Sequence, residues 1–153
     1  MDRHETYMDR ALSLAQQALK RGDWPVAALL VADGQVLAEG QGRQRTSTDP
    51  TWHAEIEAIR HAAASGADLS RATLYCTMEP CPMCAWAMRL SGIQRVVLGA
   101  RHADLQRVDL GHYSLERFAE LMGYPLDLVE GVRRDECVDL RRRWGKDLVR
   151  DRE

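Results

Sequence analysis

Residues 72–84 read ATLYCTMEPCPMC, a short apolar segment followed directly by two cysteines with prolines beside them. The continuous apolar run predicts a buried strand over 72–78. A helix is predicted from Pro80 to Ser91, because proline is favoured in a first helical turn and Gly92 is favoured just past the last one. We therefore expect a strand that leads straight into a helix, with Cys81 and Cys84 in the first turn.

Other patterns divide the rest of the chain into helices and strands. Apolar residues at helical spacing predict a helix over 7–19 that ends at Gly22. The apolar run 26–31, followed by Asp33-Gly34, predicts an antiparallel hairpin. The remaining predictions are a helix that Thr51 caps and Ser65-Gly66 ends, a strand over 93–100, a helix over 115–122, a strand over 126–129 and a charged helix from Arg133.

Strands interleaved with helices favour an α/β fold, with a mixed sheet covered by helices on both faces. With 153 residues, 45% of them hydrophobic, the chain 1–153 is expected to form one domain. The formal net charge of −2 makes a general nucleic-acid coat protein improbable. No apolar run approaches the ~20 residues that span a bilayer, and residues 1–5 do not open a secretory signal, so a soluble cytoplasmic protein is expected.

Two short motifs carry the residues that favour metal chemistry. Cys81 and Cys84 are three positions apart, so their sulfurs lie on one face of a helical turn, where the helix dipole favours thiolates. His53 begins the other motif, at the start of an earlier helix. One imidazole and two thiolates form a three-ligand zinc set with a fourth position open for water. Cys76 and Cys137 are placed like core residues, which favours an open, catalytic site over a closed, structural one.

Glu55 follows His53 by two residues and can point toward the same ion. Zinc lowers the pKa of a bound water to about 7, and a carboxylate within hydrogen-bonding reach can take its proton. The simpler interpretations of a C-x-x-C pair are a redox couple or half of a structural zinc knuckle. A redox couple would not need His53 and Glu55, and a knuckle would need two more ligands, so catalytic zinc is favoured.

Both motifs together resemble the cytidine deaminase-like superfamily, whose zinc deaminases carry H-x-E and P-C-x-x-C. The nearest branch holds bacterial guanine deaminases, fungal cytosine deaminase and tRNA adenosine deaminases. The most specific stretches are DPTWHAE at 49–55 and TMEPCPMC at 77–84. The resemblance runs from His4 to about Gly99 and returns weakly near residues 130–137.

The resemblance implies a three-layer α/β/α fold with a five-stranded mixed sheet and zinc held across two helix N-termini. It also implies hydrolytic deamination of an amino-substituted heterocycle, in which Glu55 carries a water proton to a ring nitrogen and then to the departing ammonia. Val26, Gly42 and Ala54 are the positions it places against the substrate, the last through its backbone N–H. Relatives are commonly homodimers, so association is expected here.

Four positions depart from the family pattern. Gly42 stands where relatives usually carry a base-contacting Asn, and Ala27 where Gly is common. Trp52 and Trp86 replace small residues and would reshape a nearby pocket. Losing an amide that contacts the base removes a hydrogen bond whose net contribution is about 0.5–1.5 kcal/mol. The catalytic residues of the family pattern are therefore all present, whereas the pattern does not identify the substrate.

The function expected from these residues is zinc-dependent deamination of a free heterocycle, with a guanine-type purine slightly favoured over cytosine. One alternative is a tRNA adenosine deaminase, and another is a non-catalytic zinc-stabilised binding module. The tail interleaves eight basic and six acidic residues, which favours a solvated helix over a nucleic-acid face. His102 and Asp104 are either pocket residues or ordinary polar loop residues, and Asp109 is expected at the surface. Trp24 is expected either to flank the pocket or to cap the core, with the core favoured.

Overall fold

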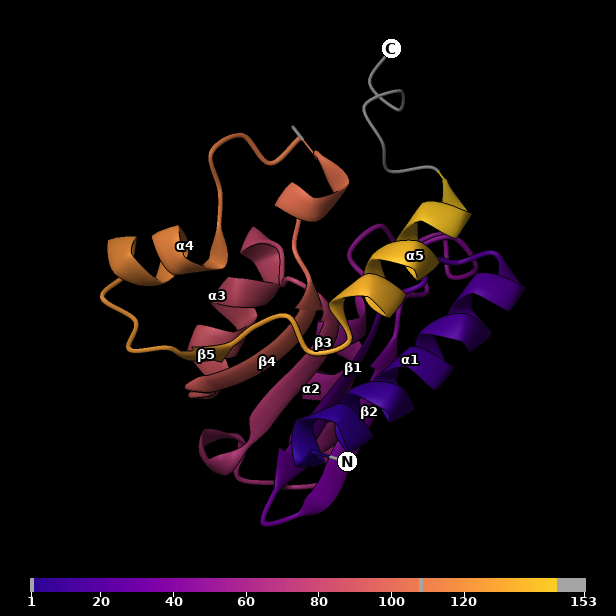
Figure 1. Ribbon diagram of the computed structural model, residues 1–153. Coiled ribbons are helices and arrows are strands. Elements are labelled where there is room, and N and C mark those ends of the chain that lie inside the picture. Colours follow the sequence, from indigo (N-terminus) through magenta and orange to yellow (C-terminus); the bar gives the residue numbers. More distant parts are fainter. Residues whose placement is uncertain (1, 108, 146–153) are drawn as a thin grey trace.

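Five strands form one mixed sheet in the computed structural model, which describes residues 2–107 and 109–145 (Figure 1). The strand order is β2-β1-β3-β4-β5. β1 pairs antiparallel with β2 and β3, and the β3-β4 and β4-β5 pairs are parallel. The bounds are β1 Ala27–Ala32, β2 Gln35–Gln41, β3 Thr73–Met78, β4 Arg95–Ala100 and β5 Asp127–Val129. The predicted five-stranded mixed sheet is confirmed.

Helices cover both faces of this sheet. α1 (Arg3–Arg21) and α5 (Arg134–Trp144) lie side by side on one face, in front of the strands in Figure 1. α2 (Ala54–Ala64) and α3 (Pro82–Ser91) pack together on the other face. α4 (Leu115–Leu121) packs against α3. The three-layer α/β/α arrangement is thus confirmed. Within the described part of the chain, none of the helices combines the length and the apolar character that crossing a bilayer requires.

The hairpin between β1 and β2 follows from its two turn residues. Asp33 and Gly34 both have positive φ, 52° and 74°, as a type I′ turn requires. Along β2, Gly40 lets α2 approach closely: a Cβ there would lie 2.0 Å from the backbone oxygen of Ala54. The sheet therefore holds the first turn of α2 by direct backbone contact.

Both site helices begin later than predicted. Thr51 does not cap α2, because its hydroxyl donates to Asp49 Oδ1 at 2.7 Å within the preceding turn. The helix begins at Ala54, with His53 in the N-cap position. α3 begins at Pro82, with Cys81 as N-cap, rather than at Pro80. Each motif thus places one candidate metal ligand, His53 or Cys81, at the N-cap of its helix.

The core lies between the helices and the sheet. Cys76 on β3 and Cys137 on α5 are 0% and 1% exposed, so both are core residues as predicted. Cys137 packs where β4 has Gly99, whose added Cβ would lie 2.4 Å from the Cys137 sulfur. This close approach docks α5 on the sheet beside the end of β4.

Candidate active site

His53, Cys81 and Cys84 come together where the N-termini of α2 and α3 meet. The Nδ1 atom of His53 lies 3.5 Å from the Cys81 sulfur and 3.6 Å from the Cys84 sulfur. The three candidate ligand atoms, one from each side chain, all lie within 4.8 Å of one another. The predicted ligand set is therefore assembled by the fold.

The spacing of these atoms fits a tetrahedral zinc ion. Zinc–nitrogen and zinc–sulfur bonds of roughly 2.0 and 2.3 Å place the two ligand atoms about 3.5 Å apart at the tetrahedral angle. His53 stands at about that distance from both sulfurs. An ion held by these three side chains keeps one coordination position for water or substrate, which is typical of catalytic rather than structural zinc.

The pKa values of the two thiols are shifted in opposite directions. The hydrogen bond from Cys84, together with His53, lowers the pKa of Cys81 to about 4, whereas the hydrogen bond to Cys81 and burial raise the pKa of Cys84. Burial alone would lower the pKa of His53, but its hydrogen bond to Cys81 and the charge of Glu55 raise it. A cation competes with these protons, so metal binding is favoured as the pH rises.

Glu55 lies beside the metal ligands on the first turn of α2. Its side chain is 3% exposed, and Oε2 accepts from the Cys84 thiol at 3.3 Å. Burial raises the pKa of this carboxyl above its usual value. A carboxyl with a raised pKa beside the candidate metal ligands is suited to accept a proton and to return it.

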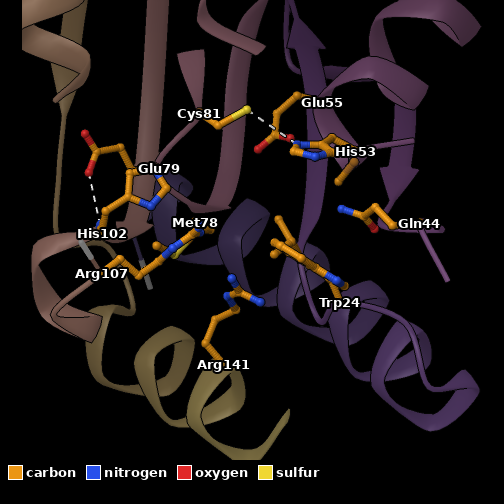
Figure 2. Close-up of a pocket in the computed structure, with 12 residues that line it drawn as sticks. Trp24, Gln44, His53, Glu55, Met78, Glu79, Cys81, His102, Arg107 and Arg141 are labelled. Carbon is orange, nitrogen blue, oxygen red and sulfur yellow. Dashed lines mark hydrogen bonds between the residues drawn. The ribbon is translucent and has the colours of Figure 1, made fainter. Parts of the chain in front are cut away.

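A pocket with an empty volume of about 340 Å³ opens onto these residues (Figure 2). Val26 and Ala54, which were predicted to contact the substrate, both line it. Gly42 does not: it is buried against the segment before β1, where its N–H donates to Val26 O, and an added Cβ would lie 2.8 Å from Trp24 O. The contacts predicted for Val26, Gly42 and Ala54 with a substrate stay predictions.

Gln44 lines the pocket two residues after Gly42, and the sequence analysis did not single it out. Its neighbours hold it in place. Arg43 Nε donates to Glu57 at 2.6 Å, and the backbone N–H of Arg45 donates to the buried Asp23 at 3.0 Å. The loop is thus tied to α2 on one side and to the end of α1 on the other, which directs the Gln44 amide to the pocket (Figure 2).

Neither of the two unusual tryptophans lines the pocket. Trp52 Nε1 donates to Glu57 and so helps to anchor the loop before α2. Trp86 is 48% exposed on α3. Trp24, predicted to be a core residue, instead forms one wall of the pocket, and its ring centroid lies 6.1 Å from that of His53. The favoured core position was wrong because Pro25 starts the run into β1 and leaves Trp24 before the start of that strand.

Arg141 is the other pocket residue that the sequence analysis placed incorrectly. We expected it on a solvated helix, but its side chain is 1% exposed and lines the pocket. The available signal was its spacing, since Cys137, Leu140 and Arg141 fall on one buried face of α5. Six charged residues of the predicted tail lie outside the described residues: Lys146, Asp147, Arg150, Asp151, Arg152 and Glu153.

His102 lies in the pocket, but Asp104 does not line it. Asp104 instead pairs with Arg134 and accepts from the Arg101 N–H at 2.8 Å. The backbone N–H of His102 donates to Glu79 Oε1 at 3.1 Å, which fixes this loop to the start of α3. Asp109 is half-exposed and pairs with Arg107, as its expected surface position implies.

His102 should make the protein acid-sensitive. Burial, followed by the charges of Arg107 and Arg141, lowers its pKa from 6.5 to about 4. Because the unfolded chain binds the proton first, stability is lost as the pH falls from about 6.5 to about 4, by up to about 1.4 kcal/mol per pH unit. In chemical denaturation, the unfolding free energy of wild type relative to His102→Gln should decrease over this range. A difference that does not change with pH would contradict this assignment.

The sequence matches known deaminases. Residues 1–100 match the family described as the cytidine and deoxycytidylate deaminase zinc-binding region. The chain is 43% identical over 104 residues to guanine deaminase of Bacillus subtilis, covering 66% of this chain and 67% of that protein. It is 35% identical over 141 residues to the tRNA-specific adenosine deaminase of the same organism, covering 90% and 85%.

Solved structures agree with these matches. Guanine deaminase from Nitrosomonas europaea superposes with a TM-score of 0.81 at 27% identity, covering 92% of this chain and 83% of that chain. A tRNA deaminase that edits the wobble position superposes with a TM-score of 0.74 at 34% identity, covering 88% and 98%. The match over residues 1–100, with a metal-ligand set suited to zinc, shows that the chain belongs to the cytidine and deoxycytidylate deaminase family and is a zinc-dependent deaminase.

Proposed function

We propose that this deaminase acts on a free amino-substituted heterocycle of nucleobase size, with a guanine-type purine the first candidate and cytosine the next. The observation that carries the proposal is the lining of the pocket, which joins Glu55 and the candidate metal ligands His53 and Cys81 to the flat Trp24 ring. Similarity to guanine deaminase, and to solved structures that hold 8-azaguanine and 2,6-diaminopurine, supports it.

The reaction follows from the placement of the residues. When bound by His53, Cys81 and Cys84, zinc would supply a water of lowered pKa at neutral pH. Glu55 accepts a proton from the attacking water and delivers it to the ring nitrogen and then to the amine. The water oxygen bonds to the ring carbon, the carbon–nitrogen bond breaks, and ammonia leaves. Ala54 opens α2, so its N–H lacks an intrahelical acceptor and can donate to a substrate oxygen or ring nitrogen.

A tRNA adenosine deaminase is the second candidate. The similarity to the Bacillus subtilis tRNA-specific enzyme extends over 90% of this chain. A groove beside the pocket mouth also contains two aromatic rings, those of Trp24 and Trp144, and could take flanking nucleotides. This candidate requires phosphate contacts, which would make binding strongly salt-dependent.

An ammonia-release screen separates the two candidates. The zinc-loaded protein is given guanine, cytosine, pterin and triazine bases, and separately an anticodon stem-loop, at low and at physiological salt. We expect turnover of at least one free base that changes little with salt. The proposal would be rejected if no free base were turned over while inosine formed in the stem-loop, at a rate that falls about tenfold or more when salt is added.

Homodimer formation stays a prediction. Trp86 and Leu90, 48% and 71% exposed, lie four residues apart on α3 and form an apolar surface that supports it. The cytoplasmic location and the assignment of residues 1–153 to one domain are likewise predictions.

A further inference from the structure

Two arginines face the metal-ligand set across the pocket. Figure 2 shows Arg107 and Arg141 entering from the side opposite Cys81 and Glu55. Arg141 comes from α5, and Arg107 comes from the loop after β4. The pocket therefore has a cationic end as well as a metal-binding end.

The Trp24 ring lies close to residues at both ends of the pocket. Its centroid lies 6.1 Å from that of the His53 ring. The guanidinium carbons of Arg141 and Arg107 lie 4.9 and 5.9 Å from a Trp24 ring centre. The Trp24 ring thus lies near both the candidate metal ligand His53 and the two cations, so a flat heterocycle packed beside this indole can reach both ends of the pocket.

Both cations are held away from solvent. Arg141 is 1% exposed and the Arg107 side chain is 9% exposed, although arginine is rarely buried without a specific interaction. Arg141 packs on Trp24 and Trp144, and Arg107 pairs with Asp109. A guanidinium in such a low-dielectric wall binds a carboxylate more strongly than a guanidinium in water does, and its planar donors match both oxygens.

His102 adds hydrogen-bonding capacity at the same end. It is 6% exposed and lines the pocket, yet within the described residues neither ring nitrogen has a hydrogen-bond partner. Buried polar atoms of native proteins are nearly always satisfied, so a group that enters the pocket is the natural partner. The acidic residues on the pocket wall do not supply it: Glu79 accepts from the N–H groups of His102 and Leu115, and Glu55 adjoins Cys84.

We propose that the pocket selects an amino-heterocycle that carries a ring carboxylate on the edge away from the reacting amine, with Arg141 as the main contact and Arg107 and His102 beside it. This specificity rests on the proposed function, because it names the substrate class of the same site. The reaction is unchanged: water adds at the amine-bearing carbon, ammonia leaves, and the carboxylate is retained in the product. A neutral base leaves the cationic end of the pocket unfilled.

The test compares matched substrates. Pterin and pterin-6-carboxylate share the guanine-type amino-oxo ring and differ by the carboxylate; cytosine and 6-carboxycytosine form a second pair. With the zinc-loaded enzyme, we expect kcat/KM to be about tenfold or more higher for the carboxylated member of at least one pair. In Arg141→Met this ratio should fall toward one, and in Arg107→Met it should fall by less.

Arg142→Met is the matched control, since Arg142 is the next residue of α5 and is exposed. It should keep the wild-type ratio. A ratio near one in wild type, or equal losses for both members of a pair in Arg141→Met, would overturn the carboxylate specificity while leaving the deaminase proposal intact. A nucleoside monophosphate preferred over every carboxylated base would also overturn it.

Binding gives an independent measurement if turnover is not detected. Calorimetric titration of zinc-loaded Glu55→Gln protein with each pair should show tighter binding of the carboxylated member, again by about tenfold or more, and loss of this preference in Glu55→Gln/Arg141→Met. Such a preference without turnover of any base by wild type would contradict the proposed function but support the anion-binding end. Equal binding within both pairs would overturn the inference.

Discussion

A Glu55→Gln variant should keep its zinc and its fold but lose turnover by a factor of about 10²–10⁴. The amide preserves the shape of the side chain, which is 3% exposed, but it cannot accept the proton of the attacking water. Burial already raises the pKa of this carboxyl, which suits it to exchange a proton during the reaction. The measurements are ammonia release per zinc-loaded molecule and zinc content by elemental analysis.

Glu57→Gln is the matched control for this variant. Glu57 is a buried carboxylate on the same helix, but it accepts from Arg43 and Trp52 rather than facing the metal ligands. Its replacement should lower the unfolding free energy while turnover per folded molecule stays within about tenfold of wild type. Undiminished turnover in Glu55→Gln would instead favour the non-catalytic zinc module and end the deaminase assignment of this carboxylate.

Replacing Cys81 or Cys84 by Ala should reduce bound zinc from about one ion per chain to well below that value. Each variant leaves two of the three ligands, and the two sulfurs stand at similar distances, 3.5 and 3.6 Å, from His53. Zinc is measured after the protein has been passed through a chelating resin. Turnover should be lost in parallel with the metal.

Cys137→Ala is the control for the loss of a thiol. Cys137 is also buried, at 1% exposure, but it packs against Gly99 outside the metal-ligand cluster. This variant should bind zinc as wild type does, with only a loss of stability from the small cavity. Full zinc occupancy in Cys81→Ala or Cys84→Ala would show that the ligands have been assigned incorrectly.

The helix starts show how far local patterns reach. Gly22, Gly92 and the Asp33-Gly34 turn were located correctly, because each depends on a backbone conformation that few residues adopt. The N-cap of α2 was misplaced at Thr51, since several polar residues before the helix can each make a local hydrogen bond. Asp49 forms that bond with Thr51, and the helix begins three residues later.

The grouping of His53, Cys81 and Cys84 with Glu55 beside them could be predicted from the chain itself, because both motifs are short and the chemistry expected of them requires these residue types at these spacings. The cationic end of the pocket was not. Trp24, His102 and Arg141 lie far apart in the chain and meet because α5 packs on the sheet beside α1 and the loop after β4 is held to Glu79, directly after β3. Whether a charged helical residue faces solvent or a pocket depends on that packing, which no local pattern specifies.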